Sequence, residues 1–293
     1  MKGIILAGGT GSRLWPITQG VSKQLLPIYN KPLVYYPLST LMLAGISEVM
    51  IITKPEDRIQ FERLLGDGQR FGISISYANQ EKPAGIAEAF IIAKEFIATD
   101  SVCLILGDNI FYGSGLGKQL SKIDASSRAT IFAYEVQDPQ RYGVVEFTES
   151  GKVVSIEEKP RNPKSSFAIP GLYFYPKSVI AISEQLKMSP RGELEITDVN
   201  LEYLAIGNLD CIILPRGTAW FDTGTIDSLN DASNYIRAIE QRQGLQIGSP
   251  EEVALKLGLI SQNSLSELIV SYPINEYRTY LESILKASSL KLD

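Results

Sequence analysis

The sequence predicts an α/β fold: a doubly wound, mostly parallel, Rossmann-like sheet with an inserted β-rich region and a helical C-terminal appendage. Short apolar runs alternate with helical patterns through the first half of the chain, which is typical of a parallel sheet with right-handed crossovers. Short β-rich segments follow, and amphipathic helical patterns fill the end. We therefore expect a main domain over residues 1–242 and a helical extension over residues 243–293.

The elements can be assigned in order from their periodicity and their flanking turn residues. Strands of the first half are expected at residues 3–7, 48–53, 73–78 and 102–106. Helices between them are expected near residues 34–44, 56–65 and 86–97. The β-rich middle covers residues 129–136, 142–147, 152–157 and 167–175, with a hairpin turn at Gly151-Lys152. The main domain then ends with helices near 178–187 and 195–206, a strand at 210–214 and a helix from about 227 to 242.

Composition limits the class of protein. The chain has 293 residues, of which 44% are hydrophobic and 21% charged, as in ordinary soluble globular proteins. No apolar run approaches the roughly 20 residues that span a bilayer, and the start of the sequence has no signal-peptide pattern. Cys103 and Cys211 lie in apolar stretches, so we expect free core thiols and a cytoplasmic location.

The charged residues narrow the chemistry further. A net charge of −5 argues against a nucleic-acid partner, which needs a basic face. The chain contains no histidine, and this excludes histidine general bases, Ser-His-Asp and Cys-His catalysis and histidine metal ligands. Any metal would be bound by carboxylates, which favours Mg²⁺, Ca²⁺ or Mn²⁺.

A glycine-rich segment follows the first predicted strand. Gly8, Gly9 and Gly11 let the backbone turn sharply and approach a ligand closely, and Arg13 adds a forked positive charge. Successive N–H groups in such a turn favour an anion. The segment lacks the Lys-Ser/Thr of a Walker A loop, and Leu14 stands where a Rossmann fingerprint has its third glycine. Alone, it fits a phosphate site or an empty tight turn.

Two aspartates follow predicted strands. Asp108 comes directly after the run at residues 102–106, and Asp222 lies in Trp220-Phe221-Asp222-Thr223-Gly224-Thr225. Alone, each also fits a turn residue, and Asp-Thr-Gly is also the triplet of aspartic proteases, although no second triplet occurs. Two carboxylates at strand ends near a phosphate loop would hold Mg²⁺ against phosphate oxygens.

Several other polar residues are candidates for ligand binding. Lys23, Lys159 and Arg191 each lie near a turn or a helix entrance and could bind phosphate, although each alone also fits a solvated surface charge. Gln80 precedes a turn that begins at Pro83. Its amide can donate and accept, so it could recognise a nucleobase edge.

Together these stretches resemble the sugar nucleotidyltransferases, the nucleoside-diphosphate-sugar pyrophosphorylases, over essentially the whole chain. The motifs that carry the resemblance are residues 6–14 with Pro16, 22–27, 107–109, 157–160, 191–198 and 220–225. Gln24, Gln80 and the stretches 240–245 and 250–252 are similar to the glucose-1-phosphate thymidylyltransferase branch.

The resemblance implies transfer of dTMP from dTTP to glucose 1-phosphate, which yields dTDP-glucose and pyrophosphate on the way to dTDP-rhamnose and related deoxysugars. It also implies Mg²⁺ as cofactor, a sugar-binding role for the β-rich region, and a homotetramer with the tail helices at subunit contacts. No membrane partner is expected. The attacking phosphate oxygen is already ionised at neutral pH, so no general base is required.

The resemblance also implies a role for individual residues. The catalytic residues would be Arg13, Lys159, Asp108 and Asp222, and the metal would be bound by Asp108 and Asp222. The nucleotide would be bound by Gly8, Gly9, Thr10, Gly11, Arg13, Lys23, Gln24, Gln80, Pro83, Gly85 and Asp108. The sugar phosphate would be bound by Asn109, Gly143, Glu158, Lys159, Ile169, Tyr173 and Arg191.

Two positions depart from the family pattern, and three other functions are alternatives to dTMP transfer. Ala84 stands where many members have aspartate, and Ile226 where relatives often have a polar residue. A uridylyltransferase, or an enzyme for another sugar 1-phosphate, stays open because one methyl group is worth only about 1–3 kcal/mol of discrimination. The full set of charged site residues argues against a catalytically silent nucleotide sensor, and the missing third glycine argues against an NAD-dependent dehydrogenase.

Overall fold

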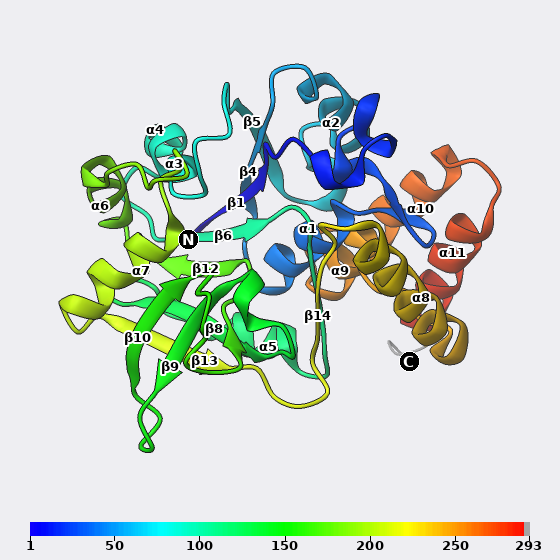
Figure 1. Cartoon of the computed structure of the whole chain (residues 1–293). Coiled ribbons are helices and arrows are strands. Elements are labelled where there is room, and N and C mark those ends of the chain that lie inside the picture. Colours follow the sequence, from blue (N-terminus) through cyan, green and yellow to red (C-terminus); the bar gives the residue numbers. More distant parts are fainter. Residues whose placement is uncertain (290–293) are drawn as a thin grey trace.

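The parallel half of the sheet forms as the sequence predicts. The computed structural model describes residues 1–289, and Figure 1 shows a central sheet surrounded by helices. Adjacent parallel strands follow the order β6-β1-β4-β5. They are β1 (Lys2–Ala7), β4 (Glu48–Thr53), β5 (Ser74–Asn79) and β6 (Val102–Leu106).

The β-rich middle continues the same sheet in mostly antiparallel pairing. The sheet runs on from β6 in the order β12-β8-β11-β9-β10, and β13 pairs with β8 as a parallel branch. The strands are β8 (Ala129–Glu135), β9 (Gly143–Phe147), β10 (Val153–Glu158), β11 (Phe167–Ala168), β12 (Leu172–Tyr175) and β13 (Leu209–Ile213). The fold class is thus confirmed, with a mixed sheet that is parallel in its first half.

Helices cover both faces of the sheet, because alternate residues of each strand point to opposite sides. Ile5 of β1 packs in a core with residues of α1 (Tyr35–Leu43) and α2 (Arg58–Leu65). Its neighbour Ile4 packs in a second core with residues of α3 (Glu88–Ile92), α6 (Val179–Gln185) and α7 (Ile196–Ala205). This is the doubly wound arrangement that the sequence predicts.

Two predicted segments are divided in the structure. The stretch 167–175 forms β11 and β12 with Pro170-Gly171 between them, because proline has no N–H to donate to a ladder. The helical stretch 86–97 forms α3 and a separate α4 (Lys94–Ile97), and Ala93 between them has ψ near 10°.

Two small strand pairs stand beside the main sheet. β7 (Asn109–Tyr112) pairs antiparallel with β14 (Ala219–Asp222), and β2 (Pro27–Ile28) pairs with β3 (Lys31–Pro32). A short α5 (Leu116–Leu120) follows β7, and α8 (Ile226–Gln243) follows β14. The β7–β14 pair matters most for function, because both strands adjoin predicted site residues.

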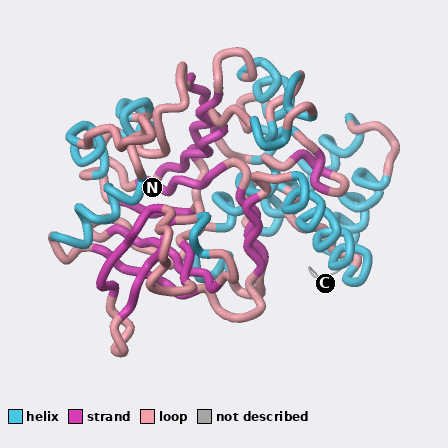
Figure 2. The backbone as a smooth tube through the Cα atoms, viewed as in Figure 1, coloured by secondary structure: helices cyan, strands magenta, loops and turns pink. Residues whose placement is uncertain are grey.

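The C-terminal region is helical as predicted. It contains α9 (Pro250–Lys256), α10 (Gln262–Ser271) and α11 (Glu276–Ser289), and the β-rich region lies on a different side of the molecule (Figure 2). Val253 and Ala254 of α9 belong to the main core, so the division at residue 242 stays a prediction. Residues 290–293 of the expected extension lie outside the described part. Among residues 1–289, no helix is both long and apolar enough to cross a membrane.

Candidate active site

The glycine-rich segment turns directly after β1. Gly11 has a φ of 63°, which favours glycine, and its carbonyl accepts hydrogen bonds from Leu14 N (2.9 Å) and Thr18 Oγ1 (2.8 Å). A Cβ atom on Gly8 would lie 2.2 Å from Gln80 Oε1. The segment therefore needs glycine for both its turn and its close packing.

The β7–β14 pair brings two carboxylates to one place. Asp222, the last residue of β14, is paired in register with Asn109, the first residue of β7. The backbone carbonyl of Asp108 accepts hydrogen bonds from Thr223 N (3.1 Å) and Thr223 Oγ1 (2.8 Å). Two aspartates far apart in the sequence are thus fixed side by side through their backbones.

Asp108 is buried and held in its charged form. Burial opposes its ionisation, but the Lys23 ammonium and a hydrogen bond from Asn109 Nδ2 (3.0 Å) outweigh burial and hold the pKa of Asp108 below its ordinary value. The Lys23 ammonium forms an ion pair with Asp108 Oδ2. Lys23 therefore provides positive charge at the edge of the candidate site.

The pKa of Asp222 is shifted in the opposite direction. Burial and the negative charge of Asp108 raise the pKa of Asp222, and the cationic side chains of Lys23, Arg13 and Arg141 offset this only in part. A Cβ on Gly224 would lie 2.8 Å from a terminal nitrogen of Arg13 and 2.9 Å from Asp222 Oδ1. The Arg13 guanidinium and the Asp222 carboxylate thus share the small space over Gly224.

Lys159 lies at the end of β10 in a strained conformation. β10 ends at Glu158, as expected from Pro160, and Lys159 has a φ of 44°, which non-glycine residues rarely adopt. Its backbone N–H donates to the carbonyl of Tyr142 (3.0 Å), and its ammonium lies 3.5 Å from Glu158 Oε1. Strain of this kind costs about 1–3 kcal/mol and is concentrated at functional sites.

Arg191, on the loop before α7, lies among three carboxylates. It forms an ion pair with Glu193, and its guanidinium is 3.4 Å from Glu158 Oε1 and 3.4 Å from Glu195 Oε1. Thr197 Oγ1 donates to Glu158 Oε2 (2.7 Å). This cluster joins the loop to β10 and places a second cation near Lys159.

The remaining predicted sugar-site residues form a polar and aromatic wall. Asn109 Oδ1 accepts from Gly171 N (3.1 Å) and Trp220 Nε1 (2.7 Å), so its amide is fixed from two sides. A Cβ on Gly143 would lie 3.4 Å from Glu158 Oε2. Burial, and then the charges of Glu158 and Asp108, raise the pKa of Tyr173 far above its ordinary value, so its hydroxyl stays neutral.

These residues surround one cavity of about 390 Å³. Eleven of the predicted site residues line it: Gly9, Arg13, Asp108, Asn109, Gly143, Glu158, Lys159, Ile169, Tyr173, Arg191 and Asp222. All the predicted sugar-phosphate and metal residues are therefore in one place. The individual role of each residue stays a prediction.

The other predicted nucleotide residues lie outside the lining of this cavity. Gln80 Nε2 donates to the Gly85 carbonyl (3.2 Å) and to Glu88 Oε2 (2.7 Å), which joins the turn at Gly85 to the glycine-rich segment. Gln24 is buried and accepts from Ser22 Oγ (2.7 Å). Gly8 packs against Gln80, and Lys23 forms the ion pair with Asp108. Gly11 forms the turn of the glycine-rich segment, and Thr10 and Pro83 are exposed.

Some lining residues were absent from the predicted set. Arg141 and Tyr142 line the cavity beside Asp222, and Glu193, Glu195 and Trp220 line it as well. Arg141 directly precedes the predicted strand at residues 142–147, which contains the predicted site residue Gly143, and a cation at this position is the sequence signal for it. Ile226, one of the two positions that differ from the family pattern, begins α8, is 44% exposed and does not line the active-site cavity.

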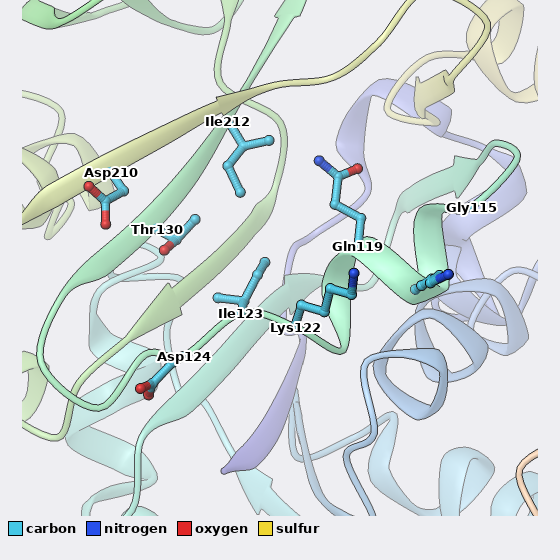
Figure 3. Close-up of a pocket in the computed structure, with 9 residues that line it drawn as sticks. Gly115, Gln119, Lys122, Ile123, Asp124, Thr130, Asp210 and Ile212 are labelled. Carbon is cyan, nitrogen blue, oxygen red and sulfur yellow. The ribbon is translucent and has the colours of Figure 1, made fainter.

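A second hollow lies elsewhere on the molecule. It has a volume of about 530 Å³ and lies between the segment that contains α5 and the strands β8 and β13, with Lys122, Asp124, Thr130 and Asp210 among the side chains around it (Figure 3). None of the predicted site residues lines it. The larger hollow is thus separate from the candidate active site.

Comparisons with known proteins decide the family. A family model described as nucleotidyl transferase matches residues 2–239. A Neisseria meningitidis protein named glucose-1-phosphate thymidylyltransferase is 55% identical over 287 residues, which is 98% of this chain and 100% of that one. A Mycolicibacterium smegmatis protein of the same name is 56% identical over 285 residues, 97% and 99% of the two chains. The chain belongs to the glucose-1-phosphate thymidylyltransferase branch of the nucleotidyl transferase family.

Solved structures agree with this family. A Bacillus anthracis structure, described as a glucose-1-phosphate thymidylyltransferase in complex with a sucrose, matches with a TM-score of 0.75 and 42% identity, covering 81% of this chain and 95% of that one. A UDP-glucose pyrophosphorylase complexed with UDP-glucose matches with a TM-score of 0.70 and 24% identity, covering 83% and 99%. At that identity the second match shows the fold alone. The resemblance and the fold class predicted from the sequence are both confirmed.

Proposed function

We propose that this chain transfers the dTMP unit of dTTP to glucose 1-phosphate, forming dTDP-glucose and pyrophosphate. The observation that carries the proposal is the gathering of Arg13, Lys159 and Arg191 with the Asp108–Asp222 pair around one cavity. The family supports the proposal, because two relatives at 55% and 56% identity, matched over nearly their whole length, are named for this activity.

The chemistry requires alignment and charge neutralisation rather than a proton acceptor. An oxygen of the glucose 1-phosphate attacks the α-phosphorus of dTTP and forms a new P–O bond, while the bond to the β-phosphate oxygen breaks. The attacking oxygen is already ionised, so a chain without histidine can catalyse the step. Lys159 and Arg191 would hold the sugar phosphate, and Arg13 would neutralise the departing pyrophosphate.

A magnesium ion fits the donor set of this site. Among residues 1–289, no cluster of three or more acidic or cysteine side chains could hold a metal. Mg²⁺ is commonly bound by one or two carboxylates together with substrate phosphates and water, and Asp108 with Asp222 would supply the carboxylates. The raised pKa of Asp222 marks a carboxylate whose charge is incompletely balanced in the protein. When bound, the ion would supply positive charge to the phosphate oxygens of the nucleotide.

The two substrates would occupy neighbouring parts of the site. The nucleotide would lie along the glycine-rich segment, with Gly8, Gly9, Thr10 and Gly11 toward its phosphates. Lys23, Gln24, Gln80, Pro83 and Gly85 would surround its base and deoxyribose. The sugar would contact Asn109, Gly143, Glu158, Ile169 and Tyr173, with Arg191 and Lys159 at its phosphate. The fixed amide of Asn109 suits it to bind a sugar hydroxyl.

We also propose a homotetramer located in the cytoplasm. Val270 and Ile274 of the C-terminal region are 72% and 90% exposed, and contact with a second subunit would bury them. Cys103 and Cys211 are free thiols, which suits a reducing compartment. Sedimentation equilibrium of the full chain, compared with a Val270→Asp/Ile274→Asp variant, tests the assembly.

The test of the activity is pyrophosphate release in the presence of Mg²⁺, with dTTP, UTP and the other nucleoside triphosphates crossed against a panel of sugar 1-phosphates. We expect the fastest release from dTTP with glucose 1-phosphate. If UTP or another sugar 1-phosphate gave faster release, the substrate assignment would change to that compound and the type of reaction would stay the same. An absence of release from dTTP with glucose 1-phosphate would contradict the proposal.

A further inference from the structure

Three carboxylates contact the Arg191 guanidinium, although a single negative charge would neutralise it. Its guanidinium contacts Glu158, Glu193 and Glu195, and all four side chains line the candidate active-site cavity. An incoming phosphate therefore meets an arginine that already has carboxylate partners. A phosphate can be bound there only if one of these contacts is given up or shared.

The three carboxylates differ in how firmly they are held. Glu158 also accepts from Thr197 Oγ1 (2.7 Å), and Glu195 also accepts from Ser189 Oγ (2.7 Å). Their side chains are 24% and 10% exposed. Glu193 is 37% exposed, and among residues 1–289 its carboxylate has Arg191 as its one polar partner. Glu193 is thus the carboxylate that can leave most easily.

We propose that Glu193 is a competing anion, which occupies Arg191 in the free enzyme and is displaced by the phosphate of the sugar substrate. This rests on the proposed function, in which Arg191 binds that phosphate. Glu158 and Glu195 would keep the guanidinium in place during the exchange, because each has a second partner. Glu193 would then set the affinity for the sugar phosphate by competing for the same nitrogen atoms.

The direction of the effect separates competition from simple positioning. If Glu193 competes, removing its charge strengthens substrate binding. If Glu193 instead orients Arg191 for the substrate, removing its charge weakens binding. Partly exposed ion pairs are worth little, so we expect Glu193→Gln to lower the KM for glucose 1-phosphate about two- to fivefold.

A matched control is available on the same molecule. Glu184 accepts a hydrogen bond from Lys94 Nζ (2.7 Å) and is 39% exposed, much as Glu193 is, but it lies outside the cavity. Glu184→Gln should leave the KM unchanged. In an Arg191→Gln background, Glu193→Gln should no longer lower the KM, since the shared partner is gone.

The experiment measures the KM for glucose 1-phosphate at saturating dTTP in these variants. An unchanged or raised KM in Glu193→Gln would overturn the proposal, as would an equal decrease in the Arg191→Gln background. If the wild-type chain releases no pyrophosphate, the proposed function fails, and calorimetric titration with inorganic phosphate then tests the competition alone. Tighter phosphate binding by Glu193→Gln than by the wild type would support it, and equal or weaker binding would reject it.

Discussion

Asp108, which directly precedes β7, and Asp222, the last residue of β14, lie next to each other where these strands pair, and their pKa values are displaced in opposite directions. Burial disfavours the charge of both, but the Lys23 ammonium and hydrogen bonds compensate Asp108, whereas the charge of Asp108 adds to the burial of Asp222. Paired acidic groups with divergent environments are typical of catalytic sites. The pair therefore predicts that substitution of each aspartate has a different effect on stability.

Replacement of either aspartate should abolish most of the metal-dependent turnover, by on the order of 100-fold, but the two variants should differ in stability. Asp222→Asn removes an unfavourable buried charge and should raise the melting temperature at neutral pH. Asp108→Asn leaves the ammonium of Lys23 without its carboxylate partner and should cost about 1–3 kcal/mol. Thermal denaturation of the metal-free proteins measures both. Full activity in either variant would contradict the metal assignment.

The pH dependence follows from the direction of the shift. A raised pKa means that folded Asp222 binds its proton more readily than the unfolded chain does, so its contribution to stability falls as pH rises above the ordinary value of 3.8. The stability gain of Asp222→Asn should therefore be largest near neutral pH and disappear below that value. A gain that is constant with pH would show that the carboxylate charge is not its cause.

Arg13 should be needed for turnover and not for folding. Its side chain is exposed at the cavity, so Arg13→Gln should change stability by less than about 0.5 kcal/mol. Loss of charge stabilisation at the leaving group should lower kcat by about 10²- to 10³-fold. Arg63→Gln, at an exposed position on α2 outside the cavity, is the matched control. A kcat for Arg13→Gln within twofold of the wild type would remove Arg13 from the catalytic set.

The contact between Gly8 and Gln80 predicts a nucleotide-binding defect. A methyl group at residue 8 would lie 2.2 Å from Gln80 Oε1, and the Gln80 amide is fixed by Gly85 and Glu88. Overpacking of this kind costs about 1–3 kcal/mol of stability or forces a side chain to move. Displacement of Gln80, which is proposed to contact the nucleotide, should raise the KM for dTTP about tenfold in Gly8→Ala. Gly20→Ala, where no atom lies within 4 Å of the added Cβ, should have no effect. Equal KM values for the two variants would contradict a role for this contact.

A buried ion pair links α8 to the β2–β3 hairpin. Lys31 Nζ lies 2.8 Å from Glu240 Oε1, and the two side chains are 1% and 5% exposed. Burial lowers the pKa of Lys31 despite the attraction of Glu240. Lys31→Met alone should therefore destabilise the protein by about 3–5 kcal/mol, because it leaves the buried Glu240 carboxylate without its cationic partner.

The double variant Lys31→Met/Glu240→Leu removes both charges and should recover much of that loss, as apolar replacements of buried pairs often do. Recovery will be incomplete, because Glu240 also accepts from Asn30 Nδ2 (3.0 Å) and Ile247 N (2.8 Å). Urea denaturation of the wild type, the single variants and the double variant gives the coupling energy. A double variant less stable than Lys31→Met would contradict this account.

The sequence predicted the strands of the main sheet and most helices closely, because short apolar runs mark them, such as residues 102–105 of β6, which are fully buried. It did not predict the small strand pairs β7–β14 and β2–β3. It missed the break at Pro170-Gly171, where one apolar stretch serves two strands. The predicted site residues that line the cavity lie together in the structure, because several of the family motifs that contain them stand at the ends of strands. The contacts of Arg191 with Glu158 and Glu195 could not be predicted, since they depend on how a loop folds against β10. The positive φ of Lys159 has no sequence signal either.

The most direct test of the central claim follows the α-phosphorus of the nucleotide. The full chain is incubated with Mg²⁺, glucose 1-phosphate and dTTP labelled with ³²P at the α-position, and the products are separated by chromatography. We predict that the label moves into dTDP-glucose, with unlabelled pyrophosphate released in equal amount. Label that stays in dTTP, or that appears as free dTMP without a nucleotide sugar, would contradict the proposed transfer.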